Sequence, residues 1–440
     1  ATGIGVLDLA NALHLSAETE FAHPDFNVRP QLNSYKWYDY YADEQEHIET
    51  VVGPFNGPTV WDFAGLTDTV MLAIVDDGIT DHEDLPRARI EENGWRGRFP
   101  AKRPGCWPSS AHGMGCAGII AASHTTDSSL AGDPATGVIS LNPHTRLINI
   151  QLFDPLGYGG QVSDMAAGIS YAWRQGAAVM NNSWSFFPGV LGFPEIDLAL
   201  DSAYERGRNG KGCVLVFSTG NDGPTYPGFV NYPARHDRTL AVGAVDKYGG
   251  HLYYSQWGPE LDVVAPSGMT CFLGDVWTLD QMYYSGYNPN LVEFPGCPPP
   301  ITWDCIGEGE GNNMNYDCHF GGTSAAAPIV TGIASLLISR DSNLTAPEIY
   351  DIIRHSADPH VNLLGEPINP PDSMYAYGRA DAFRAILSIA RGDTDNSGWI
   401  DITDVNRLVD HLFLSLEPLF PTNRLGDCSC DGIIDVTDLN

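Results

Sequence analysis

The sequence has few basic residues. It also lacks long hydrophobic runs, and no apolar run approaches the length of a membrane span. It contains 23 Lys and Arg against 55 Asp and Glu, which gives a formal net charge of -32 over 440 residues. Nucleic-acid binding needs a basic surface, so this balance argues against it. The same balance suits a soluble, calcium-loaded, extracellular protein.

The sequence begins at Ala1 without a methionine or a signal peptide, so we expect a processed or trimmed product. Nine cysteines, an odd number, predict an oxidising compartment with some disulfides and at least one free thiol. The length is enough for a large catalytic domain plus a small module. These features together predict a secreted protein.

Buried-strand patterns alternate with helix patterns through the middle of the chain. Continuous apolar runs predict strands at 69–78, 147–153, 177–185, 212–223, 240–245 and 261–265. Apolar periodicity predicts helices at 162–175, 196–206, 346–355 and 380–390. The alternation predicts an α/β fold, with a doubly wound, mostly parallel sheet and helices on both faces.

Small residues surround Ser324 and lead into an apolar run that ends near residue 339. This pattern predicts a tight loop entering a buried helix, with Ser324 in the first turn near the positive end of the helix dipole. That position stabilises a serine oxygen that carries a transient negative charge. Taken alone, the segment is explained as well by an ordinary helix cap.

Three other polar residues stand at strand ends or at a helix start. Asp76 ends the first predicted strand, His112 opens a run of small residues, and Asn221 follows a strand and a glycine. Polar groups at the carboxyl ends of parallel strands meet at one edge of the sheet. There a histidine can take the proton of Ser324 while a carboxylate holds its tautomer. The Asn221 amide and the Ser324 N–H can donate to an oxyanion.

The order Asp76, His112, Asn221, Ser324 resembles the subtilisin-like serine proteases, over roughly residues 60–391. The resemblance implies a subtilisin fold, with Asp76, His112 and Ser324 as the triad and Asn221 as oxyanion donor. The motifs around the triad residues also resemble the kexin-like branch, whereas 232–234 and 258–267 resemble bacterial subtilisins. Calcium in the catalytic domain is expected from the family alone.

The resemblance also implies residues that flank an extended substrate: Gly159, Gly160, Ser183, Trp184, Ser185 and Asn231. Asn231 would lie near the base of the primary specificity pocket. We find no acidic cluster there, so we expect a preference for apolar or aromatic side chains rather than paired basic ones. Cys116 would be a buried free thiol near the histidine, or a plain small core residue.

Two segments depart from the strand–helix rhythm. Residues 1–34 contain a stretch at 19–26 that resembles the closing strand of an inhibitory propeptide, so we interpret 1–34 as a propeptide remnant or an N-terminal extension. The peptidase domain then spans 35–391 and begins with a loop-rich surface segment. Within it, 268–320 is interpreted as a disulfide-stapled insertion of unknown pairing that contains Cys271, Cys297, Cys305 and Cys318.

Two acidic loops repeat near the C-terminus, at 392–404 and 426–438. Their oxygen spacing matches an EF-hand calcium loop, with aspartate in place of the final glutamate; two Asp-Gly turns are the alternative. The predicted ligands are Asp393, Asp395, Ser397, Trp399, Asp404, Asp427, Ser429, Asp431, Ile433 and Asp438. The pair resembles a type I dockerin, which implies a calcium-folded, EF-hand-like α module at 392–440 and a cohesin-like partner. The sequence stops at Asn440, where the second helix should begin, so we expect either a truncated sequence or an incomplete module.

The favoured hypothesis is a secreted, monomeric, Ca²⁺-binding serine endopeptidase that cleaves proteins or peptides through an acyl-enzyme on Ser324. The first alternative is a catalytically silent adhesion or scaffold protein on a protease fold. An esterase using the same site is a weaker alternative. Retention of all three triad residues and Asn221 favours the endopeptidase.

Overall fold

The structure is a computed structural model that describes residues 39, 41–53, 59–61, 69–92, 94–96, 111–125, 137–153, 160–268, 276–282, 286, 315–361 and 367–389. The chain divides into two units, 1–34 and 35–440, and every described residue belongs to the second. The propeptide-like strand and the two C-terminal calcium loops lie outside the described residues. The predicted domain boundaries therefore stay predictions.

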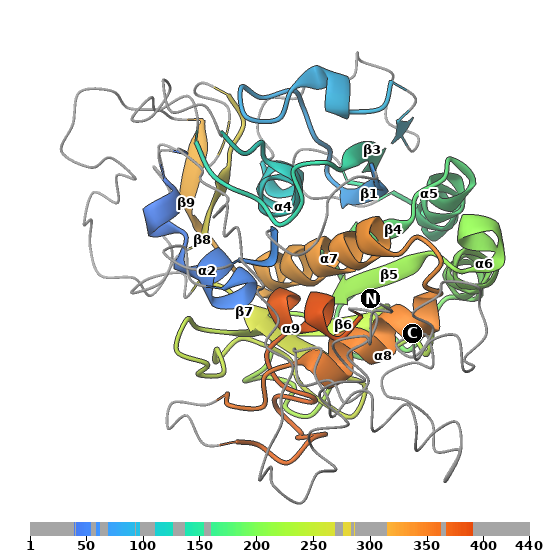
Figure 1. The fold of residues 1–440 in the computed structure, drawn as a ribbon. Coiled ribbons are helices and arrows are strands. Elements are labelled where there is room, and N and C mark those ends of the chain that lie inside the picture. The colour runs from blue at the N-terminus through green and yellow to red at the C-terminus, as the bar shows by residue number, and fades with distance from the viewer. Residues whose placement is uncertain are drawn as a thin grey trace, which may run out of the picture. The chain divides into compact units, whose positions relative to one another are not determined.

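A seven-stranded parallel sheet lies at the centre of the second unit, with strand order β2-β3-β1-β4-β5-β6-β7 (Figure 1). Leu72 of β1 pairs with Leu147 of β3 on one side and Val179 of β4 on the other. Residues 72–76 are all buried, as expected for a strand covered on both faces. The strands are β1 (Met71–Asp76), β2 (Trp95–Arg96), β3 (Arg146–Gln151), β4 (Val179–Asn182), β5 (Val214–Ser218), β6 (Leu240–Val245) and β7 (Val263–Pro266).

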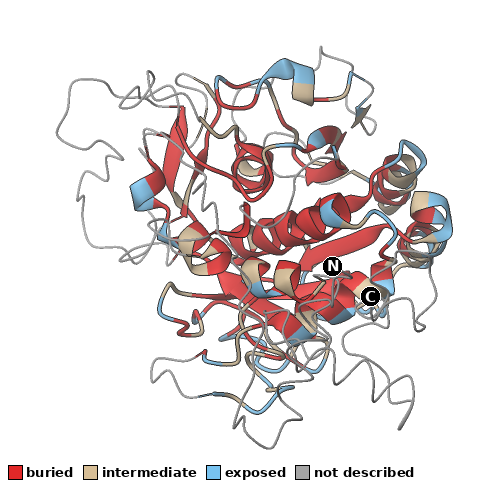
Figure 2. Cartoon of the chain, viewed as in Figure 1, coloured by how far each residue is buried: buried red, intermediate tan, exposed pale blue. Residues whose placement is uncertain are grey.

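Helices cover both faces of this sheet (Figures 1 and 2). One core contains Leu72 and Ile74 of β1 together with α2 (Glu46–Val52), α4 (His112–Ala121), α7 (Thr323–Arg340), α8 (Ala346–Ser356) and α9 (Ala382–Leu387). The other contains Ala73 and Val75 together with α5 (Val162–Arg174) and α6 (Pro194–Gly210). Successive side chains of β1 thus pack into two separate cores, one on each face of the sheet. The predicted α/β class is confirmed.

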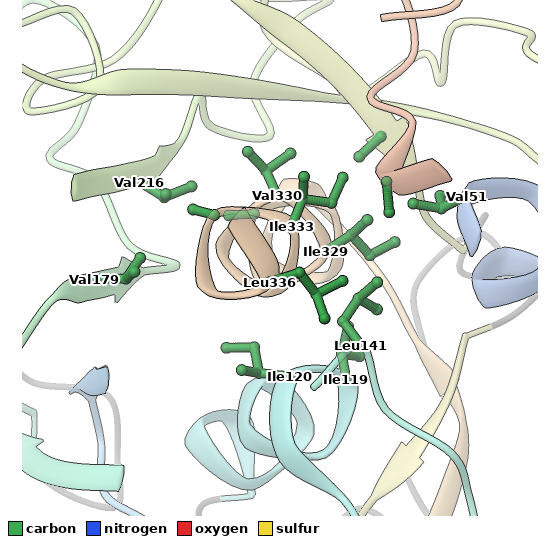
Figure 3. Packing of buried hydrophobic residues seen from close by; sticks show 14 of the residues in the cluster. Val51, Ile119, Ile120, Leu141, Val179, Val216, Ile329, Val330, Ile333 and Leu336 are labelled. Atoms are coloured by element: carbon green, nitrogen blue, oxygen red, sulfur yellow. The ribbon is translucent and has the colours of Figure 1, made fainter. Parts of the chain in front are cut away.

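Helix α7 is the central element of the first core (Figure 3). All its residues from 325 to 339 are buried. Val330 and Ile333 lie on the side of α7 away from α4, and Leu336 lies on the side that faces Leu141 and α4. Within the part of the chain that the structure describes, α7 is the one helix long and apolar enough to cross a membrane, but 89% of it is buried. Its burial shows α7 to be a core helix, and the described residues contain no clear membrane span.

Two regions contain structure that the sequence did not predict. The segment after residue 35, predicted to be rich in loops, contains the 3-10 helix η1 (Ala42–Glu44) and the helix α2, whose Ile48 and Val51 are buried. A second 3-10 helix, η2 (Arg87–Arg89), lies outside both regions, after β1. Within 268–320, β8 (Val276–Leu279) pairs antiparallel with β9 (Tyr316–Phe320). The two strands pack on α4, where Thr278 Oγ1 donates to the Gly115 carbonyl at 2.6 Å. This hairpin therefore leads directly from the insertion into α7.

Candidate active site

Asp76 and His112 form a hydrogen-bonded pair at the carboxyl edge of the sheet. Asp76 is the last residue of β1, and His112 is the first residue of α4. His112 Nδ1 lies 2.8 Å from Asp76 Oδ1 and 3.0 Å from Oδ2. The Asp76 side chain is 3% exposed and the His112 side chain 27% exposed. A buried carboxylate thus holds one ring nitrogen and leaves Nε2 on the accessible side of the pair.

Burial alone lowers the pKa of His112, but the neighbouring charges outweigh it. The charge of Asp76, its hydrogen bond to the ring and the charge of Asp77 raise the pKa of His112 from 6.5 to about 9. The pair therefore strongly favours the imidazolium form. This is the form that arises when a histidine removes a proton from a nucleophile.

Ser324 is the second residue of α7 and follows Gly322, whose φ of 72° turns the chain into the helix. Its Oγ donates to the Ser183 carbonyl at 3.3 Å, while Ser183 Oγ donates to the Ser324 carbonyl at 3.0 Å. The end of β4 and the start of α7 are thereby joined by two reciprocal hydrogen bonds. Ser324 is held at the same edge of the sheet as Asp76.

The buried thiol of Cys116 connects the serine and the aspartate. Cys116 Sγ lies 3.8 Å from Asp76 Oδ2 and 3.7 Å from the Ser324 carbonyl. Cys116 and Cys213 are free, and burial raises the pKa of the Cys116 thiol well above its usual value. The prediction of a buried free thiol beside the histidine is confirmed. By type and spacing, Asp76, His112 and Cys116 also form a possible metal-ligand group, but this thiol stays protonated and Asp76 already accepts from His112.

Asn221 contacts the residue that precedes Ser324. Its Oδ1 accepts from the Thr323 N–H at 2.9 Å and from Thr323 Oγ1 at 3.0 Å. Two donors on one oxygen fix the orientation of the side-chain amide. Asn221 itself is exposed, so its Nδ2 is left available to donate to a bound group.

The predicted substrate-binding residues adjoin this edge of the sheet. Trp184 packs edge-on against Phe217 with ring centroids 5.5 Å apart. Asn231 is buried, donates from Nδ2 to Ser185 Oγ at 3.1 Å and accepts from Gln256 Nε2 at 3.1 Å. The Asn231 side chain is therefore a rigid link beneath the surface rather than a mobile polar group.

Of the predicted substrate-binding glycines, Gly159 and Gly160, only Gly160 is among the described residues. Gly160 N donates to the Leu152 carbonyl at 3.2 Å, just beyond the end of β3. Gly159 lies outside the described residues. Because β3 is the neighbour of β1, Gly160 lies on the carboxyl side of the sheet, where Asp76 also lies.

A separate pair of buried carboxylates, Asp39 and Asp84, was not predicted. Thr125 N donates to both oxygens of Asp39, at 3.1 and 3.0 Å, and Val138 N donates to Asp84 Oδ2 at 3.0 Å. Burial raises the pKa of Asp39 to about 7. Burial and then the charge of Asp39 raise the pKa of Asp84 well above its usual value. Two buried carboxylates can supply two of the six to eight oxygen ligands that a Ca²⁺ ion takes.

The parallel α/β sheet brings the Asp76–His112 pair and the helix-start Ser324 to one edge, which is an arrangement that suits a serine hydrolase. The sequence pattern of the subtilase family matches residues 67–378, and the chain belongs to that family.

Several characterised relatives resemble the chain. It is 28% identical over 417 residues to a calcium-dependent protease of a Nostoc species, and the alignment covers 88% of this chain and 56% of that protein. It is 29% identical over 330 residues to thermitase of Thermoactinomyces vulgaris, covering 75% of this chain and 92% of thermitase. The structure of fervidolysin from Fervidobacterium pennivorans aligns with a TM-score of 0.59 and 25% identity, covering 82% of this chain and 48% of that one. The chain thus spans little more than half of its calcium-dependent relative.

Proposed function

We propose that this chain is a serine endopeptidase in which Asp76, His112 and Ser324 form the catalytic triad. The observation that carries the proposal is the buried Asp76–His112 pair beside Ser324 at the start of α7. The matched subtilase family and the calcium-dependent protease relative support it.

In the proposed reaction, Ser324 Oγ leaves the Ser183 carbonyl and turns to His112 Nε2. His112 takes the hydroxyl proton as Oγ bonds to the carbonyl carbon of the peptide. Asp76 keeps Nδ1 protonated and stabilises the imidazolium. His112 then gives the proton to the leaving amine as the C–N bond breaks. Water, activated in the same way, hydrolyses the acyl-enzyme and frees Ser324.

The negative charge on the substrate oxygen requires donors that are in place before reaction. We infer that Asn221 Nδ2 and the Ser324 N–H supply them, because Thr323 fixes the Asn221 amide through its oxygen. The positive end of the α7 dipole adds to this stabilisation. Catalysis then depends on an amide whose orientation is set before substrate binds.

We propose that an extended peptide binds between Ser183–Ser185 and the segment that ends at Gly160. Trp184 is buried against Phe217 and so supports the backbone of this segment from beneath. Asn231 carries no charge and is engaged by Ser185 and Gln256. This arrangement supports a preference for apolar or aromatic side chains over basic ones. The kexin-like motif features do not change this proposal.

We propose Ca²⁺ as the cofactor, held in the peptidase domain by the carboxylates of Asp39 and Asp84. A bound cation would offset their mutual repulsion and join the segment before α2 to the segment after β1. We also propose that the loops at 392–404 and 426–438 bind calcium, and that the protein is secreted. None of the comparisons supports a cohesin-like partner for residues 392–440.

The test is hydrolysis of unfolded casein by the wild-type protein and by Ser324→Ala. Ser342→Ala is the matched control, because that serine is exposed and its side chain makes no contact with the site. We expect turnover in the wild type and in Ser342→Ala, and none above background in Ser324→Ala. Equal turnover in all three would refute the proposal. No turnover in any of them, with calcium present, would favour the non-catalytic scaffold.

A further inference from the structure

Asp77 is a buried carboxylate next to the catalytic pair that the proposed reaction does not use. It follows Asp76 at the end of β1 and is 8% exposed. Its Oδ1 accepts from the Gly113 N–H at 2.9 Å, and the His112 backbone supplies a further hydrogen bond. The turn that contains Asp77 is itself fixed, because Gln151 Nε2 donates to the Asp77 carbonyl at 2.8 Å. Asp77 is therefore a rigid acceptor facing the start of α4.

The start of α4 lacks a cap of its own. The residue that precedes the helix, Ala111, has no side chain able to accept from the first-turn N–H groups. Asp77 supplies this acceptor from another element. The approach is close, since a Cβ on Gly113 would lie 2.3 Å from the Gly78 carbonyl and 3.0 Å from Asp77 Oδ1. Contact between the turn after β1 and the first turn of α4 thus fixes the position of the start of α4, and with it the position of His112.

The charge of Asp77 also acts on the histidine. The titratable groups that face one another here are Asp76 at the end of β1, Asp77 in the turn that follows, and His112 and Cys116 from α4. Burial and then repulsion by Asp76 raise the pKa of Asp77 to about 7, with His112 opposing the shift. Asp77 is accordingly ionised near pH 9, where His112 titrates, and there it helps raise the pKa of His112.

We propose that Asp77 is a positioning residue for His112: its carboxylate caps α4 across the sheet edge, and its negative charge sets how strongly the histidine holds its proton. The inference rests on the proposed triad and assigns to Asp77 two effects that can be separated. Asparagine at this position keeps an oxygen acceptor for the Gly113 N–H and removes the charge. Alanine removes both.

The experiment compares Asp77→Asn and Asp77→Ala with wild type in pH profiles of kcat and kcat/KM on a peptide anilide. In Asp77→Asn we expect the acid limb to move about half a pH unit toward lower pH, with kcat on the plateau reduced by about threefold or less. In Asp77→Ala we expect the same movement and a further loss of about tenfold in kcat. Asp81→Asn, which removes an exposed charge nearby in the chain, should leave both quantities unchanged.

A second readout does not depend on activity. The pKa of His112 is measured by NMR titration in the Ser324→Ala background, with the resonance assigned by its loss in His112→Ala. We expect Asp77→Asn to lower that pKa. An unchanged His112 pKa in Asp77→Asn would overturn the charge effect, and equal plateau kcat in the Asn and Ala variants would overturn the capping effect. If the wild type proves inactive, the triad proposal fails, and the titration alone decides the charge effect.

Discussion

Replacing Asp76 by asparagine removes the charge that faces His112 and changes the volume of the side chain very little. In the wild type both carboxylate oxygens lie within 3.0 Å of Nδ1. An asparagine offers one oxygen and one NH₂ group, so the ring can bind in the tautomer that places its proton on Nε2. That tautomer cannot accept the proton of Ser324.

The magnitude follows from the pKa of His112. Its rise from 6.5 to about 9 corresponds to roughly 3 kcal/mol in favour of the imidazolium, or about 10²-fold in rate when that charge forms in the transition state. Loss of the correct tautomer adds to this. We therefore expect kcat to fall by about 10³- to 10⁴-fold in Asp76→Asn.

The assay is kcat/KM on a peptide anilide from pH 6 to 11, with Asp351→Asn as an exposed charge control on α8. A general base works when it is deprotonated, so wild-type activity should rise until the pH passes about 9. The residual activity of Asp76→Asn should rise at lower pH, because its His112 is less basic. An acid limb near the ordinary histidine pKa in both proteins would refute the reasoning.

The other predictions concern the oxyanion donor, calcium and the core. Asn221→Asp keeps the acceptor for Thr323 but loses the Nδ2 donor, so kcat should fall about 10²- to 10³-fold with KM little changed in steady-state assays. Calcium at a hundredfold excess over its Kd should stabilise the wild type by about 2.7 kcal/mol in thermal unfolding. Asp84→Asn should lose the part of this stabilisation that comes from calcium bound in the peptidase domain. An equal stabilisation of Asp84→Asn by calcium would contradict the proposed calcium site at Asp39 and Asp84. Leu336→Ala in buried α7 should cost about 2–5 kcal/mol in urea unfolding, whereas exposed Leu198→Ala should cost less than about 0.5 kcal/mol.

Much of the fold follows from local pattern. A continuous apolar run that ends in Asp-Asp-Gly is explained by a buried parallel strand, and β1 ends at Asp76 as that pattern predicts. The small residues after His112 and around Ser324 predict helices that pack closely, and α4 and α7 share one core. Local signals therefore place the triad candidates at helix starts and at a strand end.

The features that the sequence did not predict depend on contacts between distant segments. Asp39 and Asp84 influence each other electrostatically although they lie far apart in the sequence. The strands β8 and β9 lack a short turn between them, so no hairpin signal exists. Helix α2 has seven residues, too few to establish a helical period.

The most direct test of the central claim is reaction with a fluorophosphonate followed by peptide mapping. An activated serine beside an Asp–His pair should react once per molecule, on Ser324, and lose this reactivity in His112→Ala. A single adduct on Ser324 that requires His112 is the result that the triad predicts. A folded, calcium-loaded protein that stays unlabelled, or that is labelled equally well without His112, would contradict it.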